Sequence, residues 1–330
     1  MIFCFGALLS ILFLKLFYFL PIRKLEDIPN HRSMHSEPIK RSAGFVFFLL
    51  FCSILFYSAY TNINSFYQVT LIALSTFLLS SLGLIDDLFN LSSKSKLAIE
   101  LGFIFLLTFY LPSEYTIFSF FIPDFFYLDK VILTIFIVFI INLTNFMDGL
   151  DLYLSLTFII TILNIYFILN YHLNDLLFIY LLLLSSMFAF FYYNFPNAKM
   201  FMGDSGSLPL GLMISLIPLY LSTEKIKPDL INILILIPVF CIDGIFTLIK
   251  RFFEKKNIFS AHREHLYQRI QIEKNWSKKK TLLIFSSLNI IPILIYALFS
   301  SYFSFYIILF FDLVIVSLIY LFLYKKLAKF

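Results

Sequence analysis

Long runs of apolar residues dominate the chain, with short polar stretches between them. The runs lie near residues 2–21, 43–61, 66–85, 97–111, 131–147, 152–170, 175–193, 206–222, 229–250, 281–299 and 302–323. Most approach the roughly 20 residues that an α-helix needs to cross a bilayer. They lack the alternation of apolar and polar positions that the strands of a membrane β-barrel require. The pattern therefore predicts an all-α integral membrane protein with about 10–11 transmembrane helices.

Composition supports this prediction. Hydrophobic residues make up 61% of the 330 residues and charged residues 14%, whereas an ordinary soluble domain has about a quarter charged residues. We expect a single polytopic membrane domain over residues 1–330, in which the stretch 251–280 forms the longest polar loop. The segment 112–130, which contains two prolines, is expected to connect two helices at the membrane interface.

The positive charges indicate how the helices are oriented. Of the 25 Lys and Arg residues, 21 follow odd-numbered runs, and these include the cations of the C-terminal tail. Cytoplasmic loops of membrane proteins carry the excess of Lys and Arg. The N-terminus is therefore predicted to lie outside and the C-terminus in the cytoplasm. Because the net charge of +5 mainly reflects this orientation, it indicates no nucleic acid partner.

The acidic residues gather at the predicted cytoplasmic face. Six of the twelve Asp residues stand at or near cytoplasmic helix ends: Asp86, Asp87, Asp148, Asp151, Asp204 and Asp243. Carboxylates close to hydrocarbon are costly and usually mark a functional site. Mg²⁺ is typically held by one or two carboxylates together with substrate phosphates. The sequence therefore predicts a site for Mg²⁺, with Mn²⁺ as an alternative ion, at this face.

Asp86 and Asp87 are adjacent at the end of a predicted helix. Neighbouring carboxylates repel, so the pair either binds a cation or has one raised pKa. The alternative is a pair of solvated carboxylates without a ligand.

A second polar pattern follows the run 131–147. Asn142, Asn145, Asp148 and Asp151 recur at every third residue, which places them along one slowly rotating stripe of a helix. A capped helix end followed by an Asx turn would also account for these residues. The stripe is expected to bind a ligand, because a solvated loop has no need of such spacing.

Two further polar segments lie on the same face. The sequence GDSGS at 203–207 places Asp204 beside the start of a helix, where backbone amides attract anions such as phosphate, although a simple helix cap is the alternative. It is not a P-loop, because the GxxxxGK[ST] pattern is missing. The sequence HREHLYQR at 262–269 has two His residues without an evident third zinc ligand, so contacts of its His and Arg residues to phosphate are preferred over a zinc site, and a solvated basic loop is the alternative.

Taken together, these segments resemble the polyprenyl-phosphate N-acetylhexosamine-1-phosphate transferase superfamily, glycosyltransferase family 4. The resemblance extends from near residue 27 to residue 269. It rests on five motifs: an RSxHxxPxPRxGG-like stretch at 32–44, the DD pair with Lys96 after it, NxxNxxDGxD at 142–151, GDxGS at 203–207, and Asp243 with the HREHLYQR stretch. The last motif is similar to the branch that acts on UDP-GlcNAc, UDP-FucNAc or UDP-QuiNAc and includes enzymes that start O-antigen chains.

The chain departs from the family pattern at four positions. Lys40 replaces the second proline of the early motif, and Ser42 and Ala43 replace small glycines there. Leu152 replaces the last glycine of the DGxDG element and adds bulk beside Asp151, so an inactive scaffold of the same fold is one alternative. The triple-His signature of the peptidoglycan branch is missing, which argues against the phospho-N-acetylmuramoyl-pentapeptide transferase as the alternative.

The resemblance implies transfer of a sugar 1-phosphate from a UDP-N-acetylhexosamine to undecaprenyl phosphate, with release of UMP. It also implies a multi-pass protein of the bacterial inner membrane, in contact with membrane lipids, with a cytoplasmic active site and a homodimeric assembly. Direct attack by the lipid phosphate and a covalent two-step route both remain open. A flippase for the same lipids is a further alternative, but a carrier keeps its ionisable residues near the bilayer midplane. Only Asp312 has such a position.

The resemblance also implies roles for individual residues. Asp86, Asp87 and Asp204 are predicted to be catalytic, and together with Asp148 to hold the metal. Substrate contacts are predicted for Lys96, Asn142, Asn145, Asp148, Asp151, His262, Arg263, His265 and Arg269, and contacts to the lipid phosphate for Arg32, His35 and Arg41.

Overall fold

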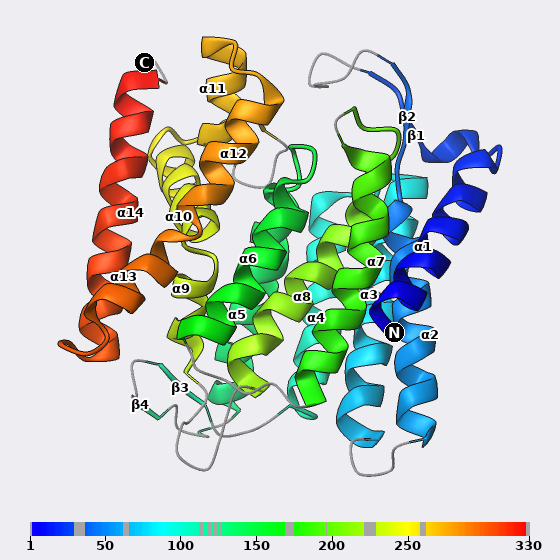
Figure 1. Ribbon diagram of the computed structural model, residues 1–330, viewed down its shortest axis with the longest axis horizontal. Helices are drawn as coiled ribbons and strands as arrows, with labels where there is room; N and C mark the ends of the chain where they lie inside the picture. Colours follow the sequence, from blue (N-terminus) through cyan, green and yellow to red (C-terminus); the bar gives the residue numbers. More distant parts are fainter. Residues whose placement is uncertain are drawn as a thin grey trace. The chain divides into compact units, whose positions relative to one another are not determined.

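A computed structural model describes residues 2–29, 37–61, 66–111, 115–117, 120–121, 125, 127–168, 175–195, 197–220, 229–257 and 262–327. Within these described residues, each of the eleven apolar runs overlaps with helix (Figure 1). This confirms the all-α class, because a chain in hydrocarbon must satisfy its backbone hydrogen bonds within each segment. The α-helices are α1 (Ile2–Phe19), α2 (Ala43–Thr61), α3 (Phe66–Phe89), α4 (Ser93–Thr108), α5 (Leu128–Phe146), α6 (Tyr153–Ile168), α7 (Asp175–Asn194), α8 (Asp204–Tyr220), α9 (Ile233–Leu236), α10 (Pro238–Phe253), α11 (Leu266–Lys274), α12 (Lys278–Leu288), α13 (Ile291–Phe299) and α14 (Phe305–Leu327).

The helices fall into two compact units. The first comprises Met1–Tyr110, Thr134–Leu152 and Leu173–Met213. In it α2 packs against α3 and α7, and α7 also packs against α1. Aromatic side chains fill this core: Phe47 and Phe48 of α2 are fully buried, and the ring of Phe47 lies 5.9 Å from that of Phe190. The strands β1 (Glu26–Asp27) and β2 (Ile39–Lys40) pair antiparallel after α1.

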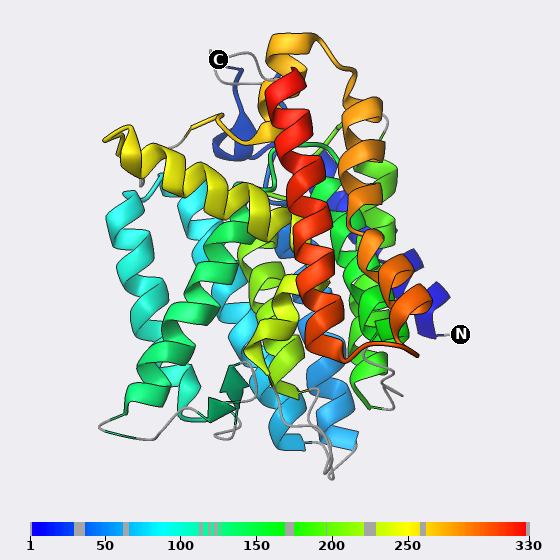
Figure 2. The same ribbon diagram turned by 90° about the vertical axis from the view of Figure 1, so that its left-hand side faces the viewer.

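The second unit comprises Leu111–Leu133, Tyr153–His172 and Ile214–Phe330. Within it α14 packs against α10 (Figure 2), and α6 packs against α12 and α13. The predicted connection at 112–130 contains a short antiparallel pair, β3 (Thr116–Ile117) and β4 (Phe120–Phe121), and part of it lies outside the described residues. The 3-10 turn η3 (Leu230–Asn232) leads into α9.

The run 229–250 forms a broken helix and not one straight span. Its two parts, Leu230–Leu236 and Pro238–Phe253, meet at an angle of 101°. Proline lacks a backbone N–H and interrupts the helix there. Asn164 donates to the carbonyl of Leu236 at 3.2 Å, and Asn289 accepts from the amide of Val239 at 3.4 Å. Buried amide side chains therefore satisfy backbone groups that the break leaves without helical partners.

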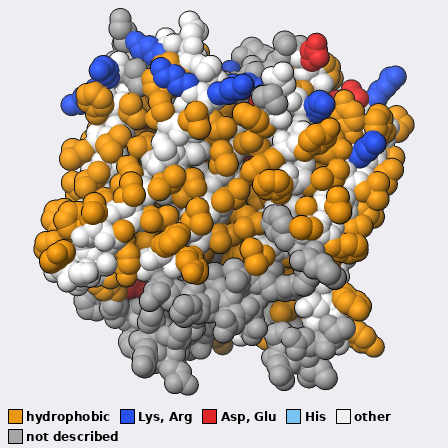
Figure 3. All heavy atoms as spheres, viewed as in Figure 1, with side chains coloured by type: hydrophobic (Ala, Val, Ile, Leu, Met, Phe, Trp, Pro, Cys, Tyr) orange, Lys and Arg blue, Asp and Glu red, His pale blue; other side chains and the backbone are white. Residues whose placement is uncertain are grey.

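Among the described residues, five helices are long and apolar enough to cross a membrane, or six if the broken helix is one span. Three shorter apolar helices lie in α1, α6 and α7. Figure 3 shows that hydrophobic side chains cover most of the described surface on the face that it draws. The protein is therefore a multi-pass membrane protein, while the total of about 10–11 spans stays a prediction.

Candidate active site

The site forms where α3 ends and α4 begins. Asn90 takes a positive φ of 49° after α3, and Ser92 caps α4 by accepting from the amide of Ser95 at 3.1 Å. This tight reversal directs the first turn of α4 back toward the last turn of α3. Lys96 consequently donates to Asp86 Oδ2 at 3.1 Å, while Asp86 Oδ1 accepts from the amide of Leu91 at 2.7 Å.

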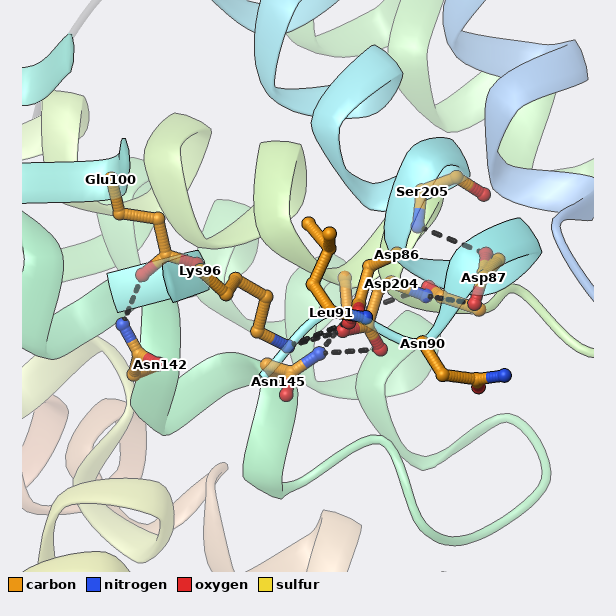
Figure 4. Close-up of polar contacts among 12 residues, drawn as sticks. Asp86, Asp87, Asn90, Leu91, Lys96, Glu100, Asn142, Asn145, Asp204 and Ser205 are labelled. Carbon is orange, nitrogen blue, oxygen red and sulfur yellow. Dashed lines mark hydrogen bonds and ion pairs between the residues drawn. The ribbon is translucent and has the colours of Figure 1, made fainter. Parts of the chain in front are cut away.

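Lys96 also joins Asp86 to Asp204, the first residue of α8. Its ammonium contacts carboxylate oxygens of both residues (Figure 4), and all three side chains are mostly buried. Burial alone would lower the pKa of Lys96, but the carboxylates of Asp204 and Asp86 outweigh it and raise the pKa. Lys96 is therefore a permanent cation between two acids that lie 118 positions apart in the chain.

Asn145 of α5 holds the other oxygen of Asp204. Its amide nitrogen donates to Asp204 Oδ1 at 3.0 Å and to the hydroxyl of Ser207 at 2.8 Å. Three motifs that are far apart in the sequence, the DD pair with Lys96, the Asn stripe and GDxGS, therefore meet through direct hydrogen bonds.

Asp87 has a different environment from Asp86. It accepts from the hydroxyl of Ser42 at 2.6 Å and from the backbone amides of Asp204 and Ser205 at 3.4 Å each. The next two amides of α8, at 206 and 207, donate to the carbonyl of Gly203. The backbone amides at the start of α8, which were expected to bind phosphate, therefore already donate to acceptors within the protein.

Two glycines allow the end of α3 and the GDxGS segment to approach each other closely. Gly203 has a φ of +71°, and a Cβ there would lie 2.5 Å from Asp87 Oδ2. A Cβ on Gly83 of α3 would overlap the backbone of Asp204. The left-handed conformation and the close contact both exclude larger residues at 203.

The early motif pairs with the GDxGS segment. The amide of Phe201 donates to the carbonyl of Lys40 at 2.7 Å, and the amide of Gly44 donates to that of Met202 at 2.9 Å. Arg41 donates to the backbone carbonyl of Asp87 and, at 3.4 Å, to Asn90 Oδ1. Residues 40–44 therefore hold the backbone on both sides of the acidic cluster, at Asp87 and at residues 201–202. Arg32 and His35 lie outside the described residues.

The structure explains two departures from the family motifs. The ammonium of Lys40 donates to carbonyls at the end of α1, including that of Phe17 at 2.9 Å, so this cation caps a helix C-terminus. Leu152 has a φ of +61°, a conformation that favours glycine, and its side chain is buried. Its amide is held by Asn194 Oδ1 at 2.8 Å. Leu152 thus keeps the turn that a glycine would make.

Asp148 lies two residues after the end of α5 and is half-buried. Burial raises its pKa well above the ordinary value, and the carboxylates of Asp204, Asp87 and Asp151 raise it further. Asp148 therefore lies close enough to the carboxylates of the cluster that contains Lys96 for their negative charge to disfavour its own ionised form.

One buried acid was not found by sequence reasoning. Glu100 lies one turn after Lys96 in α4, is completely buried, and accepts from the amide of Asn142 at 2.6 Å. It falls inside an apolar run, and no motif marks it. The only available signal was the acidic residue itself within a predicted membrane helix.

The remaining predicted residues lie in the second unit. Asp243 Oδ1 accepts from the amide of Leu266 at 3.1 Å and from the hydroxyl of Tyr320 at 2.8 Å, and it lies 3.6 Å from the ring of His265. Arg269 donates to Glu273 and to the hydroxyl of Tyr324 at 2.8 Å each. Within this unit Asp243 fixes the start of α11.

His262 and Arg263 are partly buried before α11. Burial lowers the pKa of His262 to about 4, with help from His265 and Arg251, so this ring is neutral at pH 7. A neutral imidazole can accept a proton or a hydrogen bond, but it provides no positive charge for a diphosphate.

The described residues contain no group of three or more His, Cys, Asp or Glu side chains arranged to hold a metal ion. Two carboxylates, those of Asp86 and Asp204, do share one cation, Lys96. A two-carboxylate site fits Mg²⁺, because this ion usually completes its coordination with water and substrate phosphates.

Comparisons with known proteins agree with this arrangement. The family model described as glycosyl transferase family 4 matches residues 69–222. A probable undecaprenyl-phosphate N-acetylglucosaminyl 1-phosphate transferase of Bacillus subtilis is 29% identical over 74% of this chain and 69% of its own length. An undecaprenyl-phosphate alpha-N-acetylglucosaminyl 1-phosphate transferase of Thermotoga maritima is 29% identical over 80% of this chain and 78% of its own length. A phospho-N-acetylmuramoyl-pentapeptide-transferase of Dictyoglomus thermophilum is 28% identical over 87% of this chain and 96% of its own length.

The matched region contains the DD pair, Lys96, the Asn stripe and GDxGS. Since these residues also form one connected cluster, the comparisons support the resemblance of the chain to the polyprenyl-phosphate N-acetylhexosamine-1-phosphate transferase superfamily, glycosyl transferase family 4.

Proposed function

We propose that the protein transfers an N-acetylhexosamine 1-phosphate from a UDP-sugar to undecaprenyl phosphate and releases UMP. The observation that carries this proposal is the cluster of Asp86, Lys96, Asn145 and Asp204, in which side chains from three separate motifs share direct hydrogen bonds. The names of the relatives from Bacillus subtilis and Thermotoga maritima support the acceptor lipid and the type of reaction.

The main obstacle in this reaction is electrostatic. The phosphate of the lipid must attack the β-phosphorus of the nucleotide sugar, so two anions approach each other. Positioning and neutralisation of charge therefore contribute more than covalent chemistry by the protein. Lys96 is suited to this task, because its ammonium stays charged and can contact a diphosphate oxygen between Asp86 and Asp204.

Mg²⁺ would be held by Asp204 and Asp86, with Asp148 close by. The ion would supply positive charge at the phosphates and at the departing UMP. Asn145 keeps one oxygen of Asp204 oriented, and Lys96 keeps both acids near each other.

The two members of the DD pair are proposed to differ in role. The second pKa of a phosphate monoester is about 6, so the lipid phosphate needs little help from a base at pH 7. Asp86 faces Lys96 and is placed for substrate or metal, whereas Asp87 is engaged by Ser42 and the start of α8. We assign Asp87 to positioning of Asp204.

The sugar is proposed to be an N-acetylated hexose, and the product to prime a cell-surface polysaccharide such as O-antigen. The HREHLYQR stretch supports the branch that uses UDP-GlcNAc, UDP-FucNAc or UDP-QuiNAc. In the proposed topology the cluster faces the cytoplasm of a bacterium, where nucleotide sugars are made, and the N-terminus lies outside.

An exchange assay tests the proposal. Purified protein, undecaprenyl phosphate and Mg²⁺ are incubated with labelled UMP and a panel of UDP-N-acetylhexosamines, and label is followed into the nucleotide sugar. We expect exchange with at least one sugar and none with the Asp204→Asn variant. The proposal fails if no sugar supports exchange, or if the variant behaves like the wild type.

UDP-N-acetylmuramoyl-pentapeptide belongs in the same panel. The relative from Dictyoglomus thermophilum matches over nearly its whole length, which favours this second candidate substrate. Exchange with this nucleotide alone would identify the peptidoglycan reaction. A flippase would support no exchange with any nucleotide.

A further inference from the structure

The amide group of Asn142 in α5 is fixed in one orientation by two acceptors. Its nitrogen donates to Glu100 Oε2 at 2.6 Å and to the carbonyl of Val138 at 3.0 Å. A carbonyl can only accept, and an ionised carboxylate can only accept. The nitrogen must therefore face these two groups, and the chemistry of the partners settles which end of the amide carries the oxygen.

Asn145 is constrained in the same way one turn later. Its nitrogen donates to Asp204 Oδ1 at 3.0 Å and to the hydroxyl of Ser207 at 2.8 Å. Ser207 in turn donates to the carbonyl of Gly203 at 3.3 Å, so its hydroxyl hydrogen is already used. Both hydrogens of the Asn145 amide are thus committed within the protein.

The consequence is a pair of carbonyl oxygens with fixed positions. Residues three apart lie on one face of a helix, so the side chains of Asn142 and Asn145 leave α5 on the same face. Neither oxygen accepts a hydrogen bond from any part of the chain that the structure describes, and both residues are partly exposed. Two oriented acceptors beside the acidic cluster suit a ligand that brings N–H or O–H donors.

We infer that Glu100 is a positioning residue that fixes the Asn142 amide, so that Asn142 and Asn145 present two acceptors to hydrogen-bond donors of the nucleotide sugar. Glu100 lies against the amide of Asn142 (Figure 4) and is completely buried, so it acts through Asn142 and does not touch substrate. The inference rests on the proposed function, because a nucleotide sugar is the donor-bearing ligand of this site. Its donors are the N–H groups of uracil or of an acetamido group and the hydroxyls of ribose or sugar.

The experiment measures binding of UMP, UDP and UDP-GlcNAc to purified protein by calorimetry, with Mn²⁺ binding followed separately by electron paramagnetic resonance. Glu100→Met removes the acceptor while keeping the length of the side chain. Glu100→Gln keeps an acceptor, because its amide can rotate to place oxygen toward Asn142. Glu254→Gln, at the exposed end of α10, is the matched control.

We expect Glu100→Met to weaken nucleotide binding about tenfold or more, which is the effect of losing one oriented hydrogen bond. Glu100→Gln and Glu254→Gln should stay within about threefold of the wild type. Equal losses of affinity for UMP and UDP-GlcNAc would show that the hydrogen-bond donor belongs to the nucleoside. A loss of affinity confined to UDP-GlcNAc would show that it belongs to the sugar.

A double variant separates orientation from a structural effect. Asn142→Asp alone places two carboxylates against each other and should weaken binding about 100-fold. Adding Glu100→Gln supplies a donor toward the new carboxylate and leaves its other oxygen as the outward acceptor, so binding should recover to within about tenfold of the wild type.

Three results would overturn the inference. They are unchanged nucleotide binding in folded Glu100→Met, a double variant no better than Asn142→Asp, and a loss of Mn²⁺ binding that accounts for the nucleotide effect. Failure of the proposed function would be recognised differently, because the wild type itself would then bind none of the three nucleotides.

Discussion

Asp86 and Asp87 are adjacent in the sequence, yet their carboxylates bind different parts of the first unit. Asp86 binds Lys96 and the amide of Leu91, whereas Asp87 binds Ser42 and the first amides of α8. The DD pair therefore combines an acid that is available to ligands with one that fixes the neighbouring helix.

This difference predicts distinct effects of the same substitution. Asp87→Asn places an amide nitrogen against backbone N–H groups and should lower the free energy of unfolding by about 1–2 kcal/mol, as loss of a helix cap does. Asp86→Asn should abolish exchange activity with little change in thermal stability. Thermal unfolding in detergent and the exchange assay measure the two effects. Equal destabilisation by both variants would contradict the division of roles.

Lys96 should be needed for stability only when no metal ion is bound. Lys96→Met leaves Asp86 and Asp204 without their shared cation, so the variant should unfold at a lower temperature in EDTA. Mg²⁺ or Mn²⁺ should restore part of this loss, because the ion neutralises the same carboxylates. Exchange activity should fall more than about 100-fold, since the proposed function places this ammonium against the diphosphate. A variant that responds to metal no more than the wild type does would count against a two-carboxylate metal site.

Asp148 should make stability depend on pH. Burial raises its pKa in the folded protein above the value of about 4 in the unfolded chain, and Asp204 and Asp87 contribute. Folding thus favours the protonated form of Asp148. The stability that this form contributes is fully present below about pH 4, the pKa of the unfolded chain, and is lost as the pH rises through the folded pKa. In EDTA, the Asp148→Asn variant, which cannot ionise at this position, should melt at a higher temperature than the wild type, and the difference should grow as the pH rises from 5 to 8.5. A gain that shrinks with rising pH would refute the assignment.

Gly203 should tolerate no side chain. Gly203→Ala forces an alanine into a φ of +71° and brings its Cβ against Asp87, so we expect a loss of about 2 kcal/mol or more. Gly102→Ala in α4 is the matched control, because a Cβ there meets nothing within 4 Å and alanine favours helix by up to about 1 kcal/mol. Chemical unfolding of both variants gives the comparison. Similar losses at the two glycines would falsify this reading of the turn.

The sequence predicted those features that residue type determines locally. Apolar runs predict helices because hydrocarbon leaves a backbone no other hydrogen-bond partners. The cluster of Asp86, Lys96 and Asp204 was expected from family motifs, and these side chains do meet. The metal, the sugar and the catalytic roles stay predictions.

Other features depended on contacts between distant residues. Glu100 binds Asn142, 42 positions away, and neither its spacing nor its flanking residues distinguish it from the apolar run around it. Lys40 appeared as a departure from a motif, but its ammonium caps α1. The 101° break before Pro238 had a local signal in the proline, yet the compensating amides of Asn164 and Asn289 come from other helices.

The pairing of residues 40–44 with 200–202 also constrains the order of events during synthesis. The ribosome makes the early motif and the DD pair long before it reaches residue 200. Until α8 is inserted, Asp87 lacks the hydrogen bonds from the amides of Asp204 and Ser205. Lys96 then lacks its ion pair with Asp204 and can pair only with Asp86 of the DD pair. Nascent chains that stop after α7 thus lack these hydrogen bonds and this ion pair at the end of α3, and insertion of α8 supplies them.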